Sequence, residues 1–183
     1  MKRTLTIATT VLLAATLAAC SDTKTDNGAA KARPAASEPS AATSKAVVKS
    51  KPLTASTAFD KISASVTTAK LGSTVTAEND PNDLLGRPNQ YTSKVTFTDN
   101  RVAADDVSGT EKDAIERGGS IEVFSNEVDA KVRAQYIQTV TKGMPALAEY
   151  DYVQGTVLVR VSHYLTPKQA SDYKAAAANL GQR

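Results

Sequence analysis

The sequence predicts an α+β domain in which a small antiparallel sheet is covered by helices on one face. Three observations support this class. Runs of alternating apolar and polar residues, typical of half-buried strands, begin near residue 93. Amphipathic stretches with capping signals lie between and around them. From residue 119 onward the expected order is strand, helix, strand, strand, helix. The nearest named architecture is an open sandwich of ferredoxin-like type that lacks its closing strand.

Aromatic residues mark the domain boundary, because every Phe and Tyr lies at or after Phe59. Residues 54–183 therefore form one α+β domain. Residues 20–53 are rich in Ser, Thr, Ala, Lys and Pro and contain no aromatic residue. Such a segment cannot bury enough apolar surface to offset its ordering entropy. It is expected to be a disordered tether that holds the domain about 30 Å from its attachment point.

Each expected element has a local signal. Phe59, Ile62, Val66 and Ala69 recur at helical spacing, which predicts a first helix over Thr54–Leu71. A short capped helical turn is expected over Asp80–Gly86. The later elements are a strand over Ser93–Thr98, an ambiguous acidic stretch with a short helix near 110–117, a strand over Ser120–Phe124, a helix from Ser125 or Asn126 to Lys142, two strands over Ala148–Val153 and Thr156–Ser162, and a last helix opened by the capping box at Thr166–Gln169.

The two strands after residue 147 predict a hairpin with Gln154 and Gly155 in its turn. In that register Tyr150 and Tyr152 lie on the core face with the valines of the second strand. Glu149 then lies opposite Arg160 on the other face, which is expected to be a surface carrying one ion pair. That pairing disfavours an acid/base site made of Glu149 and Asp151.

The N-terminal residues have the features of an export signal. Lys2 and Arg3 precede an apolar run from Leu5 to Leu17, which is too short and too threonine-rich for a transmembrane helix. The segment Leu17-Ala18-Ala19-Cys20 resembles the lipobox of bacterial lipoproteins. The resemblance implies a signal peptide over 1–19, cleavage between Ala19 and Cys20, and a palmitate-type lipid anchor on Cys20. The chain would then be held at the extracytoplasmic face of the cell membrane. An ordinary secretory signal that contains a cysteine is the alternative.

Composition excludes several classes of function. Cys20 is the only cysteine, so acylation would leave no thiol for disulfides, catalysis or metal ligation. Residues 54–183 carry 14 basic and 16 acidic side chains, against six and three in residues 21–53. The basic excess therefore belongs to the signal and the linker, and no nucleic-acid-binding surface is expected.

No motif for catalysis, a metal or a cofactor accompanies the single histidine, His163. Zinc would need carboxylates for its other ligands, and no Gly-x-Ser-x-Gly elbow is present. We therefore expect no metal and no cofactor, and a protein that is not an enzyme. A hydrolase built on His163 remains the least favoured alternative.

Tyrosines supply the candidate small-ligand site. Tyr150, Tyr152 and Arg133 are the candidate binding residues of a tyrosine-lined groove, although the tyrosines also suit a core. Arg133 falls within the apolar arc of its helix. Asp129, one turn earlier, is its expected structural partner.

The domain also resembles small uncharacterised lipoproteins of actinobacteria over most of residues 80–180. The segments that carry the resemblance are Asp83–Pro88, Ser93–Phe97, Gly119–Phe124, Asp129–Arg133 and Val159–Pro167. It implies an exported, membrane-tethered domain and brings no catalytic residues. The leading hypothesis is a non-enzymatic module that binds a protein or cell-envelope component, with small-ligand binding as the alternative.

Overall fold

The structure, a computed structural model, describes residues 52–181, which contain three α-helices and five strands. The elements are α1 (Ala55–Ser65), β1 (Ala69–Thr74), β2 (Tyr91–Asp99), β3 (Gly118–Phe124), α2 (Glu127–Thr141), β4 (Glu149–Gln154), β5 (Val157–Ser162) and α3 (Pro167–Ala178). The expected signal peptide, Cys20 and nearly all of the expected linker lie outside the described residues.

The five strands form one sheet in the order β1-β2-β3-β5-β4, and every neighbouring pair is antiparallel. Strands β1, β2 and β3 follow one another across the sheet. The chain then leaves through α2 and returns as the β4–β5 hairpin, with β5 against β3. The predicted α+β class and the antiparallel sheet are confirmed.

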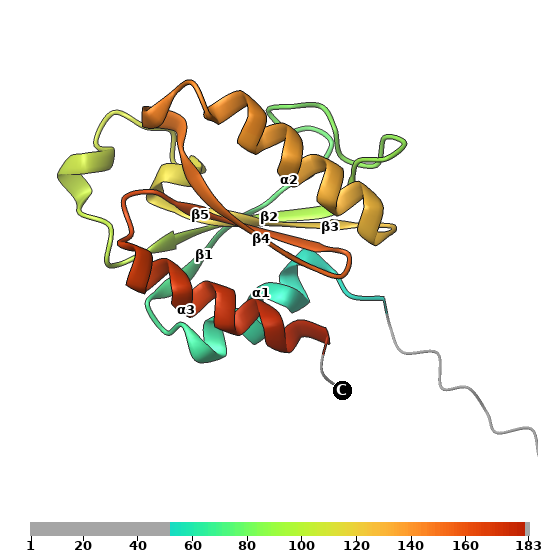
Figure 1. Cartoon of the computed structure of the whole chain (residues 1–183), viewed down its shortest axis with the longest axis horizontal. Coiled ribbons are helices and arrows are strands. Elements are labelled where there is room, and N and C mark those ends of the chain that lie inside the picture. The colour runs from blue at the N-terminus through green and yellow to red at the C-terminus, as the bar shows by residue number, and fades with distance from the viewer. Residues whose placement is uncertain (1–51, 182–183) are drawn as a thin grey trace, which may run out of the picture. The chain divides into compact units, whose positions relative to one another are not determined.

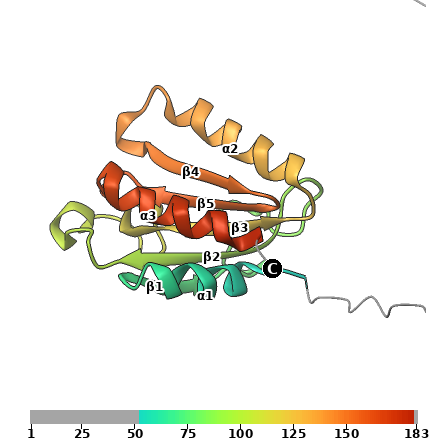
Figure 2. The same ribbon diagram turned by 60° about the horizontal axis from the view of Figure 1, so that its bottom comes forward.

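The helices cover both faces of the sheet, which differs from the single helical face that we expected. Figure 1 shows α2 on one side of the strands and α1 with α3 on the other. Helix α1 packs over β2 and β3, and α3 over β4 and β5 (Figure 2). The physical reason is that the second face is also apolar. Leu158 is fully buried there, and Phe124 is nearly so. The result is three layers rather than an open two-layer sandwich.

Two hydrophobic clusters follow from the alternation of side chains along the strands. The larger one lies between the sheet and helices α1 and α3. It includes Phe59, Phe97 and Tyr173. The ring centroid of Phe97 lies 6.0 Å from that of Phe59 and 5.2 Å from that of Tyr173. The smaller one lies under α2 and joins Tyr91, Phe124, Ala130, Ala134, Ile137 and Leu158.

The first helix is shorter than predicted. Thr54 caps α1 through its hydroxyl, but the helix ends at Ser65 instead of Leu71. Val66 and the two threonines after it are β-branched, and Ala69–Thr74 pairs with β2 as an edge strand. Ala69 is buried, as the helical spacing predicts, although it is buried from a strand.

The segment from Asp80 to Gly86 forms a non-helical turn in place of the expected capped helical turn. The Asp80 carboxylate accepts hydrogen bonds from the backbone N–H groups of Leu84 and Leu85, both at 2.8 Å. The Tyr91 hydroxyl donates to the same carboxylate at 2.7 Å. The turn holds Leu84 and Leu85, which are partly buried, against the cluster under α2.

The β4–β5 hairpin keeps the predicted faces with a shifted register. Gln154 pairs with Val157, so the turn residues are Gly155 and Thr156. Gly155 has φ +55°, a conformation that glycine adopts without strain. Each residue of β4 therefore meets a partner two positions further along β5 than predicted. A shift of two leaves every side chain on its predicted face.

The two later helices begin as predicted. The Asn126 side chain accepts from the backbone N–H of Asp129 and caps α2. Thr166 and Gln169 form the predicted capping box of α3, with Pro167 in its first turn.

Candidate functional site

The α2 side of the sheet carries a group of charged residues that lie in the middle of apolar strands. Lys94 on β2 pairs directly with Glu122 on β3. Arg160 on β5 lies opposite Ser120, one residue pair along the same face. Because β2, β3 and β5 are neighbours, the side chains that the three strands place on this face meet beneath α2. We call Lys94, Glu122, Arg133, Glu149, Asp151 and Arg160 the charge cluster.

Glu122 is the centre of the charge cluster and is 0% exposed. Its carboxylate lies 3.3 Å from the Lys94 Nζ, 3.3 Å from the Arg133 Nε and 3.1 Å from the Arg160 Nη1. Burial opposes ionisation of Glu122. The three cations outweigh that effect, so its pKa lies below the usual range. Glu122 is thus a buried anion held by three cations from two strands and one helix.

Arg160 links Glu122 to a second carboxylate, that of Glu149 on β4. Its Nε and Nη2 donate to the two oxygens of Glu149 at 2.9 and 3.0 Å. The predicted pair of Glu149 and Arg160 is confirmed, but it is buried under α2 and not on an open surface. In the observed register Arg160 lies directly opposite Asp151, and Glu149 is reached diagonally.

Among the described residues, Asp151 is the carboxylate of the charge cluster that accepts no hydrogen bond. Both of its carboxylate oxygens are buried and have no hydrogen-bond partner among the described residues. Burial, and next the charge of Glu149, raise the pKa of Asp151 to about 7. A carboxyl in this position can hold or release a proton near neutral pH. Its burial keeps it away from any substrate at the surface.

Arg133 connects the charge cluster to the outside of α2. Its guanidinium also lies 5.8 Å from the centroid of the Tyr136 ring. Two hollows, of about 280 and 370 Å³, lie on either side of Arg133 and Tyr136. Both are lined by Leu84 from the turn after β1. Val132 lines the first hollow, and Val140 lines the second.

The same side of α2 carries a row of exposed apolar side chains. Val128, Val132, Tyr136 and Val140 recur every four residues and are 42–67% exposed. We call this row, with the two hollows beside it, the α2 groove. The inner side of the helix buries Ala130, Ala134 and Ile137, so the helix is apolar on two sides. A solvent-facing row of this kind is typical of an interaction surface.

The structure separates the three predicted binding residues. Tyr150 and Tyr152 pack against the cluster under α1 and α3. Arg133 lies on the opposite face of the sheet, where it binds Glu122. The three side chains therefore do not share one groove. The expected partner of Arg133 is also wrong, because Asp129 instead accepts from the Asn126 amide at 2.7 Å.

His163 lies just beyond β5 with its ring 4.2 Å from that of Tyr164. It follows Ser162, which pairs with Glu149 of the charge cluster, but among residues 52–181 it makes no hydrogen bond or ion pair with the cluster.

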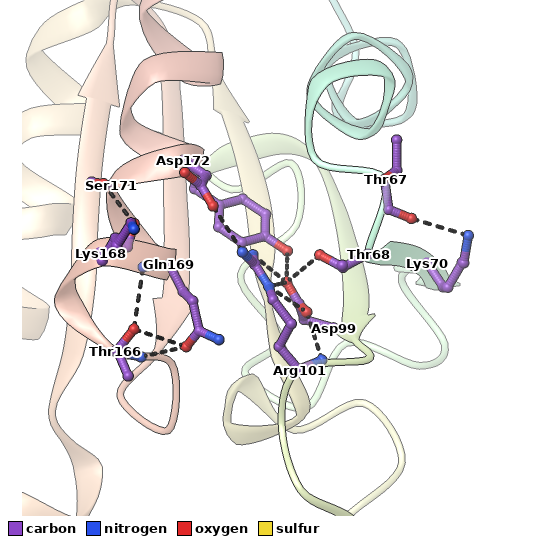
Figure 3. Close-up of polar contacts among 11 residues, drawn as sticks. Thr67, Thr68, Lys70, Asp99, Arg101, Thr166, Lys168, Gln169, Ser171 and Asp172 are labelled. Carbon is purple, nitrogen blue, oxygen red and sulfur yellow. Dashed lines mark hydrogen bonds and ion pairs between the residues drawn. The ribbon is translucent and has the colours of Figure 1, made fainter.

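A second buried polar cluster ties α3 to the sheet (Figure 3). Asp99 accepts from the Tyr173 hydroxyl at 2.6 Å and from the Arg101 Nη2 at 2.8 Å. Thr68 donates to the same carboxylate, and Arg101 also binds Asp172 on α3. Burial opposes ionisation of Asp99, but the hydrogen bonds from Arg101 and Tyr173 hold its pKa below the usual range. Every group here is engaged, which makes the cluster structural.

Sequence reasoning missed Lys94 and Glu122 as members of the site. Each stands at an alternate position of a strand whose other face is apolar, the pattern of a solvent-exposed residue. The sequence did contain one indication that this face is buried. Phe124 is an aromatic residue on the same face as Glu122, and another element has to cover it.

The domain thus belongs to the class of three-layer α+β domains with a central antiparallel sheet. Comparisons with protein-family models, curated proteins and solved structures found no match. Within residues 52–181 no group of three His, Cys, Asp or Glu side chains is placed to hold a metal ion. No helix in that range is long and apolar enough to cross a membrane.

Proposed function

We propose that this protein is a lipid-anchored, non-enzymatic binding module that recognises a protein partner outside the cell membrane through the α2 groove. The observation that carries the proposal is the exposed apolar row Val128, Val132, Tyr136 and Val140. Removing such a row from water on binding would contribute about 25 cal/mol per Å² of apolar area.

The proposed anchor rests on the segment Leu17–Cys20. Two or three acyl chains on Cys20 would hold the chain at the membrane, where one would not. The Ser-, Ala- and Lys-rich residues after Cys20 would then let the domain reach a partner. Cell fractionation tests this part. The Cys20→Ala variant is expected to leave the membrane fraction, and its retention there would contradict the anchor.

Photo-crosslinking in intact cells tests the binding surface. A photoreactive residue at Val132 is expected to capture a specific partner that the same residue at Lys174, on exposed α3 surface, does not capture. A second substitution on the same surface separates a specific partner from background. The Val128→Asp change leaves the crosslinker in place and is expected to reduce the captured band. Equal bands from positions 132 and 174 would contradict the proposal.

Small-ligand binding is the second candidate, and the two hollows favour it. Their volumes approach or fall within the range of small-molecule sites, about 300–1,000 Å³. The tyrosine involved would be Tyr136, and not Tyr150 or Tyr152. Thermal-shift screening distinguishes this candidate. A ligand that raises the melting temperature of the wild type, but not of Tyr136→Ala, would favour it over a protein partner.

A further inference from the structure

Arg133 has hydrogen-bond donors that the fold does not use. Its Nε donates to Glu122 at 3.3 Å, and among residues 52–181 neither Nη1 nor Nη2 has a hydrogen-bond partner. Arg160 also lines the second hollow, but all three of its nitrogens are engaged by Glu122 and Glu149. Arg133 therefore lines both hollows with free guanidinium donors, which match the geometry of a carboxylate.

The charge balance of the cluster also favours an incoming anion. Lys94, Arg133 and Arg160 carry three positive charges. Glu122 and Glu149 balance two of them, and the third depends on Asp151. Because the Asp151 carboxyl is buried and accepts no hydrogen bond, its ionised form is the least stabilised of the three. Whenever Asp151 is protonated, the cluster has one excess positive charge beside the α2 groove.

The shape of the groove indicates how the anion is carried. Hollows lie on both sides of Arg133 and Tyr136, so the site is open in two directions along α2. Val132 and Val140 line opposite hollows and are eight helical residues apart, which is about 12 Å. In an extended chain, residues i and i+4 lie about 13 Å apart and point to the same side. A chain that continues through the site fits this arrangement better than a chain terminus.

We infer that the α2 groove binds an extended segment of the partner protein in which an Asp or Glu side chain meets Arg133, with apolar residues two positions before and after it filling the hollows. The inference rests on the proposed function, because it takes the outer side of α2 as the binding surface. It adds the chemistry of the partner, a peptide of the form apolar-x-acidic-x-apolar. The carboxylate would accept from the free nitrogens of Arg133 while Nε remains on Glu122.

Fluorescence polarisation with defined peptides tests the inference. The protein is the full chain carrying Cys20→Ala, which avoids detergent. The probe is a labelled, C-terminally amidated peptide containing Leu-Ser-Glu-Ser-Leu, and the matched control has Gln in place of Glu. A charge-assisted hydrogen bond predicts that the Glu peptide binds about tenfold more tightly than the Gln peptide. A third peptide, with Gln and a free C-terminal carboxylate, is expected to bind like the amidated Gln peptide.

Variants of α2 locate the effect. Arg133→Gln is expected to remove the preference for the Glu peptide. Lys131→Gln changes an exposed cation on the same helix and is expected to preserve it. Because Arg133→Gln also removes a partner of Glu122, Val140→Asp provides a test at an exposed position. Its new anion in the second hollow is expected to weaken the Glu peptide more than the Gln peptide.

Three results would overturn the inference. The first is equal binding of the Glu and Gln peptides, or no binding of either. The second is tightest binding of the free-carboxylate peptide, and the third is an unchanged preference for the Glu peptide in both Arg133→Gln and Val140→Asp. The crosslink at Val132 separates this inference from the proposed function. If the crosslink persists while the peptides bind alike, the binding surface stands and the acidic specificity fails. If the crosslink is also absent, both fail.

Discussion

The Arg133 Nε lies 3.3 Å from the Glu122 Oε2, so a residue of α2 that lines both hollows is joined to the centre of β3. This contact connects the α2 groove to a carboxylate that is 0% exposed. The same carboxylate holds Lys94 and Arg160 from the two neighbouring strands. The orientation of Arg133 in the groove is therefore set by the interior of the sheet, which preorganises its free donors.

Glu122→Gln is expected to destabilise the domain strongly. The substitution conserves shape but leaves Lys94, Arg133 and Arg160 with one fewer negative charge in a buried setting. Breaking a buried ion pair by removing one partner costs about 3–5 kcal/mol. Urea unfolding followed by circular dichroism measures the change. Glu127→Gln is the control, because it breaks the exposed i,i+4 pair with Lys131, which is worth about 0–1 kcal/mol. Similar losses in the two variants would contradict the role of Glu122.

The unpaired Asp151 predicts an unusual pH dependence of stability. Its pKa is raised from 3.8 to about 7 in the folded protein. Between these values the folded state holds the proton and the unfolded state does not. The contribution of Asp151 to the free energy of unfolding is therefore fully present below about pH 4, falls as the pH rises toward 7, and stays low above it.

Asp151→Asn is expected to remove this loss. At pH 8 the variant should be more stable than the wild type by about 1–3 kcal/mol, and the difference should shrink toward pH 4. Urea midpoints at pH 4, 6 and 8 give the comparison. Asp60→Asn, at an exposed position of α1, controls for a general loss of negative charge. A wild-type-minus-variant difference that does not change with pH would rule out titration of Asp151.

Alternating patterns predicted the parts of the fold in which local sequence and tertiary environment agree. The valines of β5 and the tyrosines of β4 identified the core face of the hairpin. The pairing of Glu149 with Arg160 survived a register shift, because a shift of two leaves it on one face as a diagonal contact. Thr166 caps its helix as predicted, and so does Asn126, one of the two candidates for its helix, since capping depends only on neighbouring residues.

The predictions failed where contacts between residues far apart in the sequence determine the local structure. Residues after Ser65 fit a helix by spacing, and only pairing with β2 makes Ala69–Thr74 a strand. Lys94 and Glu122 looked like solvent-facing residues, because a single strand does not reveal that the two pair with each other across strands, or that Arg133 and Arg160 from other elements also contact Glu122. For the same reason the charged face was expected to be open, and the position of α2 over it was not predicted.

Tyr173→Phe tests the cluster that holds α3 to the sheet. The change removes a hydrogen bond of 2.6 Å to Asp99 while keeping the ring stacked on Phe97. Loss of a buried hydrogen bond to a charged acceptor is expected to cost about 1.5–3 kcal/mol. Differential scanning calorimetry should show a lower melting temperature. Tyr164→Phe, at a 38% exposed position, is the matched control and should change it little. Equal melting temperatures for the two variants would argue against the anchoring role of the Tyr173 hydroxyl.

Gly119 is a position at which the close packing of the sheet allows no side chain. A Cβ added there would overlap the carbonyl oxygen of Arg160 and the ring of Phe97. Backbone and ring are both held by the core, so Gly119→Ala is expected to destabilise the domain by about 1–3 kcal/mol or more.

The substitution at Gly119 should also reach the charge cluster. Because Arg160 would shift with its backbone, Gly119→Ala should weaken the contacts of Arg160 to Glu122 and Glu149. The double variant with Glu122→Gln should therefore lose less stability than the sum of the losses in the two single variants. Gly109→Ala, where no atom lies within 4 Å of the added Cβ, is the control and should leave the urea midpoint unchanged. Full additivity with Glu122→Gln would show that the strain at Gly119 does not reach the charge cluster.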